Sequence, residues 1–148
     1  MKNTSFTEER VALARKSFTT RRVDFSEVKG LLRAANPAPG DLVLARVEAI
    51  GQHTRLEEHF GRRAKLYPGD EIIVTYGARY APDQFEAEVP ADLSPCDLVA
   101  GGGVAARVLN RHCRMSKATR ISPIGLLLDT QGRTINLGRY ALPEAQAP

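Results

Sequence analysis

The sequence predicts a mainly β fold of the α+β class, a small β-barrel or half-open sandwich with two N-terminal helices. The chain has 148 residues, the length of about one domain. Helix caps and helical spacing of apolar residues are confined to the first 36 positions, and alternation with a period of two begins after Gly40. We therefore expect an N-terminal helical segment over 1–36, a barrel-like domain over 41–140, and a tail or linker over 141–148.

The composition is that of a folded globular chain. Hydrophobic residues make up 43% and charged residues 26%, which argues against a disordered or collagen-like protein. The longest apolar run, over 98–106 with its glycines counted, is far shorter than the roughly 20 residues of a transmembrane helix. The first ten residues are polar and lack the apolar centre of a secretory signal. We expect a cytoplasmic protein with no membrane partner.

The first predicted helix covers residues 8–16. Thr7 is a suitable N-cap, because its hydroxyl can accept a hydrogen bond from the first helical turn. Phe6 precedes this cap and can pack against Val11, the arrangement of a hydrophobic staple.

The second predicted helix begins after Asp24, which has Glu27 three residues later, the spacing of a capping box. The apolar residues that follow share one helical face: Val28, Leu31 and Leu32. We expect this helix to end near residue 35, since Asn36 and Pro37 do not favour its continuation.

Strands are predicted from residue 41 onward. Apolar and polar residues alternate over 43–47, 72–76 and 84–89. Pro39-Gly40-Asp41 and Pro68-Gly69-Asp70 place proline and glycine as a type II turn requires, directly before the first two of these strands.

Two β-hairpins are also predicted, each with a glycine in its turn to adopt positive φ. The strand pairs are 54–58 with 63–67, around Gly61, and 126–129 with 134–137, around Gly132. Strands at such close spacing favour a small barrel or sandwich.

Charge is distributed unevenly along the chain. The net charge is +4, but residues 41–104 hold six Lys and Arg against eleven Asp and Glu, whereas residues 105–140 hold seven against one. A basic segment can attract phosphate at one place on the surface. Ordinary solvated charge is the alternative, because nucleic-acid-binding domains more often carry a strongly basic patch and a recognisable motif.

A glycine-rich turn is the first candidate binding feature. Gly101-Gly102-Gly103 follows a predicted strand over 97–100 and continues into a segment that formally completes G-x-G-x-x-A. If a helix begins after the glycines, its free N–H groups and dipole can bind an anion. Three basic residues would form a stripe along that helix: Arg107, Arg111 and Arg114.

A complete dinucleotide-binding domain is not favoured, because the strands before this turn are predicted to be antiparallel and too few residues follow for a doubly wound sheet. A looser phosphate-binding loop is one interpretation of the glycines. A glycine bend within a strand is the other.

A second candidate feature is a loop that contains Tyr76, Arg79 and Tyr80. Tyrosine rings stack on planar ligands and arginine pairs with phosphate, so this loop could shape a pocket next to the glycine turn. The alternative is that the rings pack over one end of the barrel while Arg79 pairs with Asp83.

Neither a metal nor a cofactor is expected. Cys96 and Cys113 are predicted to be reduced thiols, and no spacing resembles a structural zinc site. His53, Glu57 and His59 could meet across a bend, but the usual pairing of metal-binding histidines is missing. No catalytic group can be assigned from motifs, so the sequence does not predict an enzyme.

The function predicted from these features is that of a binding or accessory module. It would recognise an anionic, phosphate-bearing ligand or partner through the glycine-rich turn and the clustered arginines. One alternative is an RNA-binding β-barrel of low sequence specificity, whose nucleic-acid partner would be held by charge. Another is a protein-interaction or regulatory domain of a larger enzyme system, with a protein partner or a neighbouring domain.

Overall fold

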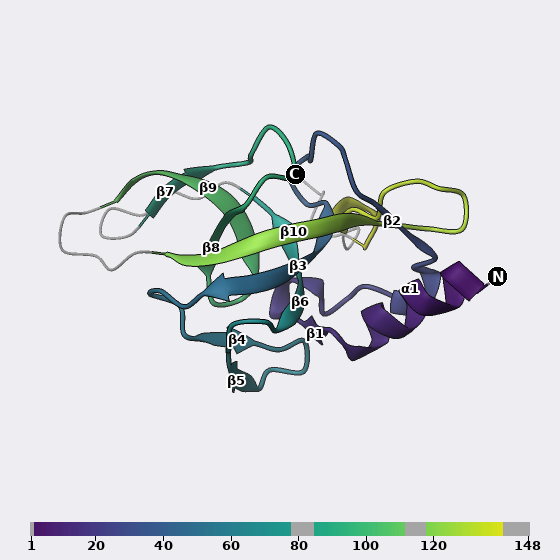
Figure 1. The fold of residues 1–148 in the computed structure, drawn as a ribbon, viewed down its shortest axis with the longest axis horizontal. Helices are drawn as coiled ribbons and strands as arrows, with labels where there is room; N and C mark the ends of the chain where they lie inside the picture. Colours follow the sequence, from purple (N-terminus) through teal and green to yellow (C-terminus); the bar gives the residue numbers. More distant parts are fainter. Residues whose placement is uncertain (1, 78–84, 112–117, 141–148) are drawn as a thin grey trace, which may run out of the picture.

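The computed structural model describes residues 2–77, 85–111 and 118–140. These residues form a mainly β fold with a closed five-stranded barrel, and one α-helix is present among them (Figure 1). The predicted β-barrel is therefore confirmed, and the barrel is closed rather than half-open.

Five strands form the barrel: β3 (Leu42–Ala49), β6 (Glu71–Tyr76), β8 (Cys96–Ala100), β9 (Val104–Arg111) and β10 (Thr119–Leu128). They are ordered β6-β3-β10-β8-β9, with antiparallel neighbours throughout. The parallel pairing of β9 with β6, at Thr75↔Val104 and Tyr76↔Ala105, closes the ring. Closure removes the unpaired edges that an open sheet would leave.

Shorter elements extend this barrel. Three strands pair with its members: β1 (Arg15–Lys16) with β6, β2 (Gly30–Leu32) with β10, and β7 (Phe85–Glu88) with β9. A separate hairpin consists of β4 (Arg55–Glu57) and β5 (Arg63–Lys65). Three 3-10 turns complete the described structure: η1 (Phe18–Thr20), η2 (Phe25–Glu27) and η3 (Leu137–Tyr140).

The barrel interior is filled by alternate residues of its strands. In β3 these are Val43, Ala45 and Val47, all fully buried. The same cluster contains Leu56 and Leu66 from the β4–β5 region. The hairpin therefore packs its apolar side against the barrel core and is fixed in position by it.

The outer wall of the barrel is covered by the N-terminal segment. Leu42, Leu44 and Ile73 belong to a second apolar cluster together with Val11 and Ala14, at the end of α1 (Lys2–Leu13). As a result β3 is buried on both faces over residues 42–45, although its alternating sequence resembles that of a half-exposed strand.

The first predicted helix exists as α1, shifted to Lys2–Leu13 from the predicted 8–16. Thr7 therefore lies inside the helix and does not cap it. Lys16 Nζ donates to the carbonyl oxygens of Val11 and Ala12 at the end of this helix. A cation at a helix C-terminus stabilises the helix. Among the described helices, none has the length and apolar character needed to cross a membrane.

The second predicted helix is wrong. Asp24 does act as an N-cap, since its carboxylate accepts from Ser26 N at 3.1 Å, but it caps only the three-residue turn η2. Gly30 and the leucines after it instead form β2 and pair with 126–128 of β10. Glycine costs about 1 kcal/mol in a helix relative to alanine, and the edge of β10 offers its backbone an alternative set of partners.

The two predicted type II turns are built alike. Gly40 and Gly69 have φ of 89° and 96°. In the first turn Asp41 N donates to Ala38 O, and the Asp41 carboxylate accepts from Ala38 N. Asp70 makes the same two hydrogen bonds with Tyr67 in the second turn. The strand predictions that follow these turns are confirmed as β3 and β6.

Both predicted hairpins are also present. β4 and β5 are antiparallel, with Leu56 opposite Ala64. In the second hairpin an antiparallel bridge joins Leu128 and Thr134, and Gly132 has a φ of 77°.

An ion pair between Arg10 of α1 and Glu71 of β6 joins the helix to the barrel. Arg10 Nε and Nη2 donate to the two carboxylate oxygens of Glu71 at 2.9 Å and 2.8 Å. These hydrogen bonds, with smaller contributions from the charges of Arg10 and Arg46, hold the pKa of Glu71 below its usual value of 4.5, although burial acts in the opposite direction. The ionised carboxylate therefore stabilises the folded chain relative to the unfolded one.

We predict that Glu71→Gln lowers the free energy of unfolding near neutral pH by up to about 1 kcal/mol, since both side chains are partly exposed to solvent. The contribution of Glu71 is complete above pH 4.5 and is lost as the pH falls through its lower folded-state pKa. Urea unfolding at neutral pH and between about pH 5 and pH 3 measures this loss. Glu48→Gln is the control, because Glu48 is exposed and has no ion pair within the described chain. Identical pH dependence in wild type and Glu71→Gln would contradict the prediction.

Candidate functional site

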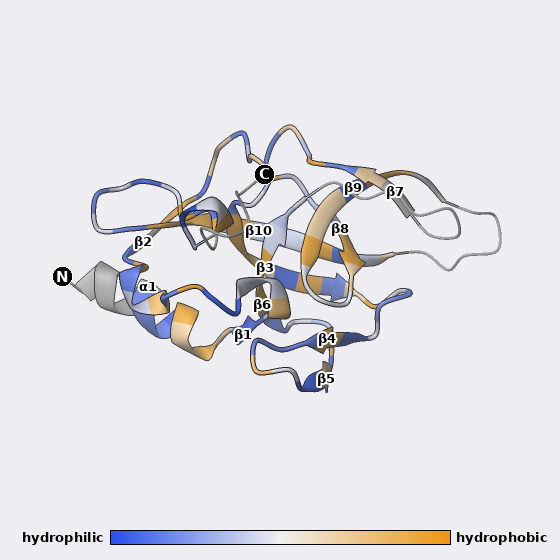
Figure 2. Ribbon diagram, turned by 180° about the vertical axis from the view of Figure 1, so that it is seen from behind, coloured by the Kyte–Doolittle hydropathy of each residue, from blue (hydrophilic) through white to orange (hydrophobic). Residues whose placement is uncertain are grey.

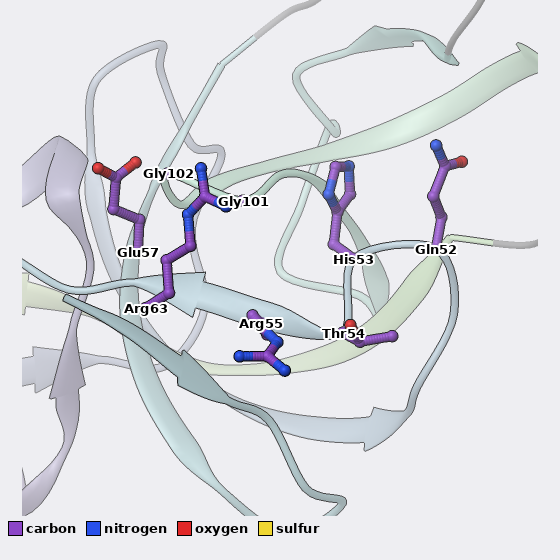
Figure 3. A pocket seen from close by; sticks show the side chains of 8 residues that line it. All are labelled: Gln52, His53, Thr54, Arg55, Glu57, Arg63, Gly101 and Gly102. Atoms are coloured by element: carbon purple, nitrogen blue, oxygen red, sulfur yellow. The ribbon is translucent and has the colours of Figure 1, made fainter. Parts of the chain in front are cut away.

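A pocket of about 410 Å³ lies between the turn that joins β8 to β9 and the β4–β5 hairpin (Figure 3). Its wall comes from three separate parts of the sequence: the segment before and within β4, the first residue of β5, and the glycine turn. The lining residues are Gln52, His53, Thr54, Arg55, Glu57, Arg63, Gly101 and Gly102.

The hairpin presents two different faces. Leu56 of β4 is fully buried in the barrel core, so its neighbours Arg55 and Glu57 face outward. The pairing register places Arg55 opposite Lys65 and Glu57 opposite Arg63, and both strands are mostly hydrophilic in Figure 2. Like charges directly opposite each other in a sheet repel. The outer face of this hairpin therefore holds three cations and one carboxylate in close proximity.

The arginines of the pocket differ from most others in the described chain. Neither Arg55 nor Arg63 makes an ion pair or a side-chain hydrogen bond with any residue that the structure describes, and the Glu57 carboxylate makes none either. In Figure 3 the guanidinium group of Arg63 extends from β5 towards Gly101 and Gly102, with Glu57 beside it. Two guanidinium groups in one pocket thus have their hydrogen-bond donors available to a ligand.

The glycine turn is tight and held by its carbonyl groups. Gly103 N donates to Ala100 O at 3.0 Å, which closes the turn. Gly101 O accepts from Glu57 N at 2.8 Å, and Gly102 O accepts from Thr19 N at 2.9 Å. In contrast, the N–H groups of Gly101 and Gly102 donate no hydrogen bond within the described residues. Consecutive free N–H groups of this kind can form a concave site for an anion.

The three glycines of the turn have different roles. Gly103 has a φ of 105°, and a Cβ there would lie 2.2 Å from Ser17 Cβ, so this position requires glycine. A Cβ at Gly102 would meet no atom within 4 Å. A Cβ at Gly101 would have only ordinary contacts, at 3.7 Å from Arg55 O and 3.9 Å from His53 Nδ1. Packing thus explains Gly103, whereas Gly101 and Gly102 form part of the pocket wall.

No helix follows the glycines. The turn joins two antiparallel strands, so the helix on which Arg107, Arg111 and Arg114 were expected to form a stripe is wrong, at least over the residues of β9. The strand arises because 104–106 pair with β8 on one side and 104–105 with β6 on the other. The backbone of 104–106 forms hydrogen bonds with two neighbouring strands, which it could not form as a helix.

The other predicted site residues lie apart from this pocket or outside the described chain. Arg107 is exposed, and its Nη2 donates to Glu88 Oε2 at 2.8 Å. Tyr76 is 2% exposed in the barrel interior, where burial raises the pKa of its hydroxyl. Four further predictions lie outside the described residues: Arg79, Tyr80, Arg114 and the side chain of Arg111.

The three residues considered for a metal are only partly brought together. His53 and Glu57 line the pocket, whereas His59 packs edge-on against Phe60, with 4.9 Å between ring centroids, and lines a different cavity. Over the described ranges, no group of three His, Cys, Asp or Glu side chains has the arrangement of a metal site. Burial raises the pKa of the Cys96 thiol to about 12, which keeps it protonated at neutral pH. Cys113 lies outside the described residues.

The sequence-based prediction of a binding site missed Gln52, Arg55 and Arg63. A usable signal was present, because the predicted hairpin alternates Arg55 with Glu57 and Arg63 with Lys65, which places all four on one face. Nothing in the local sequence predicts that this face lies beside the glycine turn, because about 40 residues separate the two. The closed barrel brings them together.

Comparison with known protein families, curated proteins and solved structures yields no match. The pocket is lined by two arginines, two glycines, one glutamate and one histidine, together with Gln52 and Thr54.

We predict that Gly103→Ala destabilises the protein by about 2–5 kcal/mol, because an alanine there combines a left-handed backbone with overlap onto Ser17. Gly102→Ala is the matched control and should change stability by less than about 1 kcal/mol. Urea unfolding of both variants in the absence of ligand measures the difference. Similar losses in the two variants would show that the turn is not held against Ser17 in this way.

Proposed function

We propose that this chain is a binding module that captures an anionic, phosphate-bearing small molecule in the pocket between the Gly101-Gly102 turn and the β4–β5 hairpin. One observation carries the proposal: two arginines without ion-pair partners in the described chain line the same pocket as two glycines whose N–H groups donate no hydrogen bond within the described residues. The glycine turn is the one predicted from the sequence, but Arg55 and Arg63 take the place proposed there for Arg107, Arg111 and Arg114.

The chemistry of these groups favours a phosphate. The planar fork of an arginine donates two parallel hydrogen bonds to phosphate oxygens. Backbone N–H groups add fixed dipoles that need no side-chain ordering. A phosphate placed between Arg63 and the glycine turn would therefore receive donors from both walls of the pocket.

The charges of the hairpin support the same ligand. Arg55 and Lys65 repel each other across β4 and β5, and a bound anion would relieve this repulsion. The volume of about 410 Å³ falls in the range of about 300–1,000 Å³ that small-molecule sites occupy. A small ligand held in the pocket thus accounts for the observations better than a polymer lying across an exposed basic surface.

We predict that wild-type protein binds pyrophosphate and inorganic phosphate at low ionic strength, and that Arg63→Gln weakens binding about 10- to 100-fold. This factor corresponds to the loss of about 1.5–3 kcal/mol for hydrogen bonds between charged groups. Isothermal titration calorimetry measures the affinities, and ligand-induced increases in melting temperature provide a second readout.

Arg107→Gln is the matched control for this experiment. It removes the same charge from an exposed arginine that pairs with Glu88 and does not line the pocket. Its affinity for pyrophosphate should stay within about threefold of the wild type, the change expected for a distant exposed charge. Equal weakening in both variants would instead indicate binding governed by overall charge, as expected for a nucleic-acid surface. Absence of any binding by the wild type would refute the proposal.

A further inference from the structure

We infer that the ligand carries hydroxyl groups beside its phosphate and is a phosphorylated sugar or polyol. This inference rests on the proposed function and names the class of molecule that the same pocket would take. Three observations support it: the size of the pocket, the carboxylate of Glu57, and the amide of Gln52.

The pocket is larger than a phosphate group requires. A volume of about 410 Å³ lies in the range of about 300–1,000 Å³ that small-molecule sites occupy. Inorganic phosphate has five non-hydrogen atoms and fills only part of the space. The remainder leaves room for a sugar or polyol, and the lining residues include no Phe or Tyr ring on which a nucleotide base could stack.

Glu57 indicates what the remainder of the ligand provides. Its carboxylate lies beside Arg63 in the pocket without an ion pair to any described residue. A carboxylate repels a phosphate, so a site adapted to inorganic phosphate alone would gain by losing it. Because an ionised carboxylate only accepts hydrogen bonds, it favours a ligand that presents hydroxyl donors next to its phosphate.

Gln52 supplies a second acceptor away from the arginines. It lines the same pocket, and in Figure 3 it lies with His53 at the opposite end from Glu57 and Arg63. Its Oε1 is buried and accepts no hydrogen bond within the described residues. An unsatisfied buried acceptor is unfavourable, and a half-turn of the amide exchanges the positions of its oxygen and nitrogen. A hydroxyl both donates and accepts, so it satisfies either orientation of the amide.

The resulting arrangement has two ends. Arg63 and the glycine turn hold the phosphate, Glu57 accepts from a hydroxyl near it, and Gln52 binds a hydroxyl at the far end. A phosphorylated sugar or polyol should therefore bind more tightly than inorganic phosphate. Its hydroxyl groups form hydrogen bonds with Glu57 and Gln52, which inorganic phosphate leaves unpaired.

The test compares inorganic phosphate, glycerol 3-phosphate, ribose 5-phosphate and adenosine monophosphate by calorimetric titration of the full chain. We expect ribose 5-phosphate and glycerol 3-phosphate to bind at least about tenfold more tightly than inorganic phosphate, the factor that one or two additional hydrogen bonds provide. Adenosine monophosphate should bind no more tightly than ribose 5-phosphate. Equal affinities of inorganic phosphate and the two sugar or polyol phosphates would overturn the inference.

Two variants assign the preference to residues. Gln52→Leu should weaken the binding of ribose 5-phosphate about tenfold more than it weakens the binding of inorganic phosphate. Glu57→Gln should bind inorganic phosphate more tightly than the wild type, because a negative charge is removed, while its preference for the sugar phosphate falls. The matched controls are Gln131→Leu and Glu48→Gln, which change exposed residues outside the pocket and should leave both quantities unchanged.

The two proposals fail in different ways. If no phosphate compound binds, or if Arg63→Gln has no effect on any of them, the proposed function is wrong. If phosphate binds through Arg63 but the preference for ribose 5-phosphate is absent, or persists in both Gln52→Leu and Glu57→Gln, only the present inference is overturned.

Discussion

The parallel pairing of β6 with β9 is the constraint on which the pocket depends. It closes the barrel and places the glycine turn beside the end of β6, where Thr75 N donates to Gly103 O at 3.0 Å. The segment after β1 holds the turn from a second side, since Thr19 donates through its N–H to Gly102 and through its hydroxyl to Gly103. A turn held at its carbonyls keeps its remaining N–H groups in a fixed direction, which is the preorganisation that anion binding requires.

The hairpin completes the pocket because one of its faces is buried in the barrel core while the other carries charged side chains. Burial of Leu56 and Leu66 in the barrel core stabilises the hairpin by roughly 1.5–3 kcal/mol for each side chain. That gain permits the opposite face to carry Arg55 next to Lys65, although these charges repel. Unfavourable charge on a rigid element is a common property of binding sites, where a ligand provides the missing partner.

Local features of the fold could be predicted from the sequence, whereas distant neighbours could not. Pro39-Gly40-Asp41 and the alternation after it predict a turn and β3, because both depend on residues close in the chain. Asp24 is the predicted N-cap, but the helix predicted after it is wrong, because the same cap can precede either a helix or a short 3-10 turn. The choice depends on the edge of β10, about 100 residues away. For the site, the glycine turn and the hairpin could each be predicted, but their position side by side could not.

Because β9 is a strand and not a helix, the arginines close to the glycines in sequence are not the ones close to them in space. Arg107 lies four positions after Gly103, a distance of about 6 Å along a helix and about 13 Å along a strand. A helix would have kept Arg107 beside the turn, but β9 extends it away to Glu88, which pairs with its charge. Arg63 lies opposite Glu57 in the hairpin, and the N–H of Glu57 donates directly to Gly101 O. One cross-strand pair and one backbone hydrogen bond therefore connect Arg63 to the turn, and the strand character of β9 leaves this position to the arginines of the hairpin.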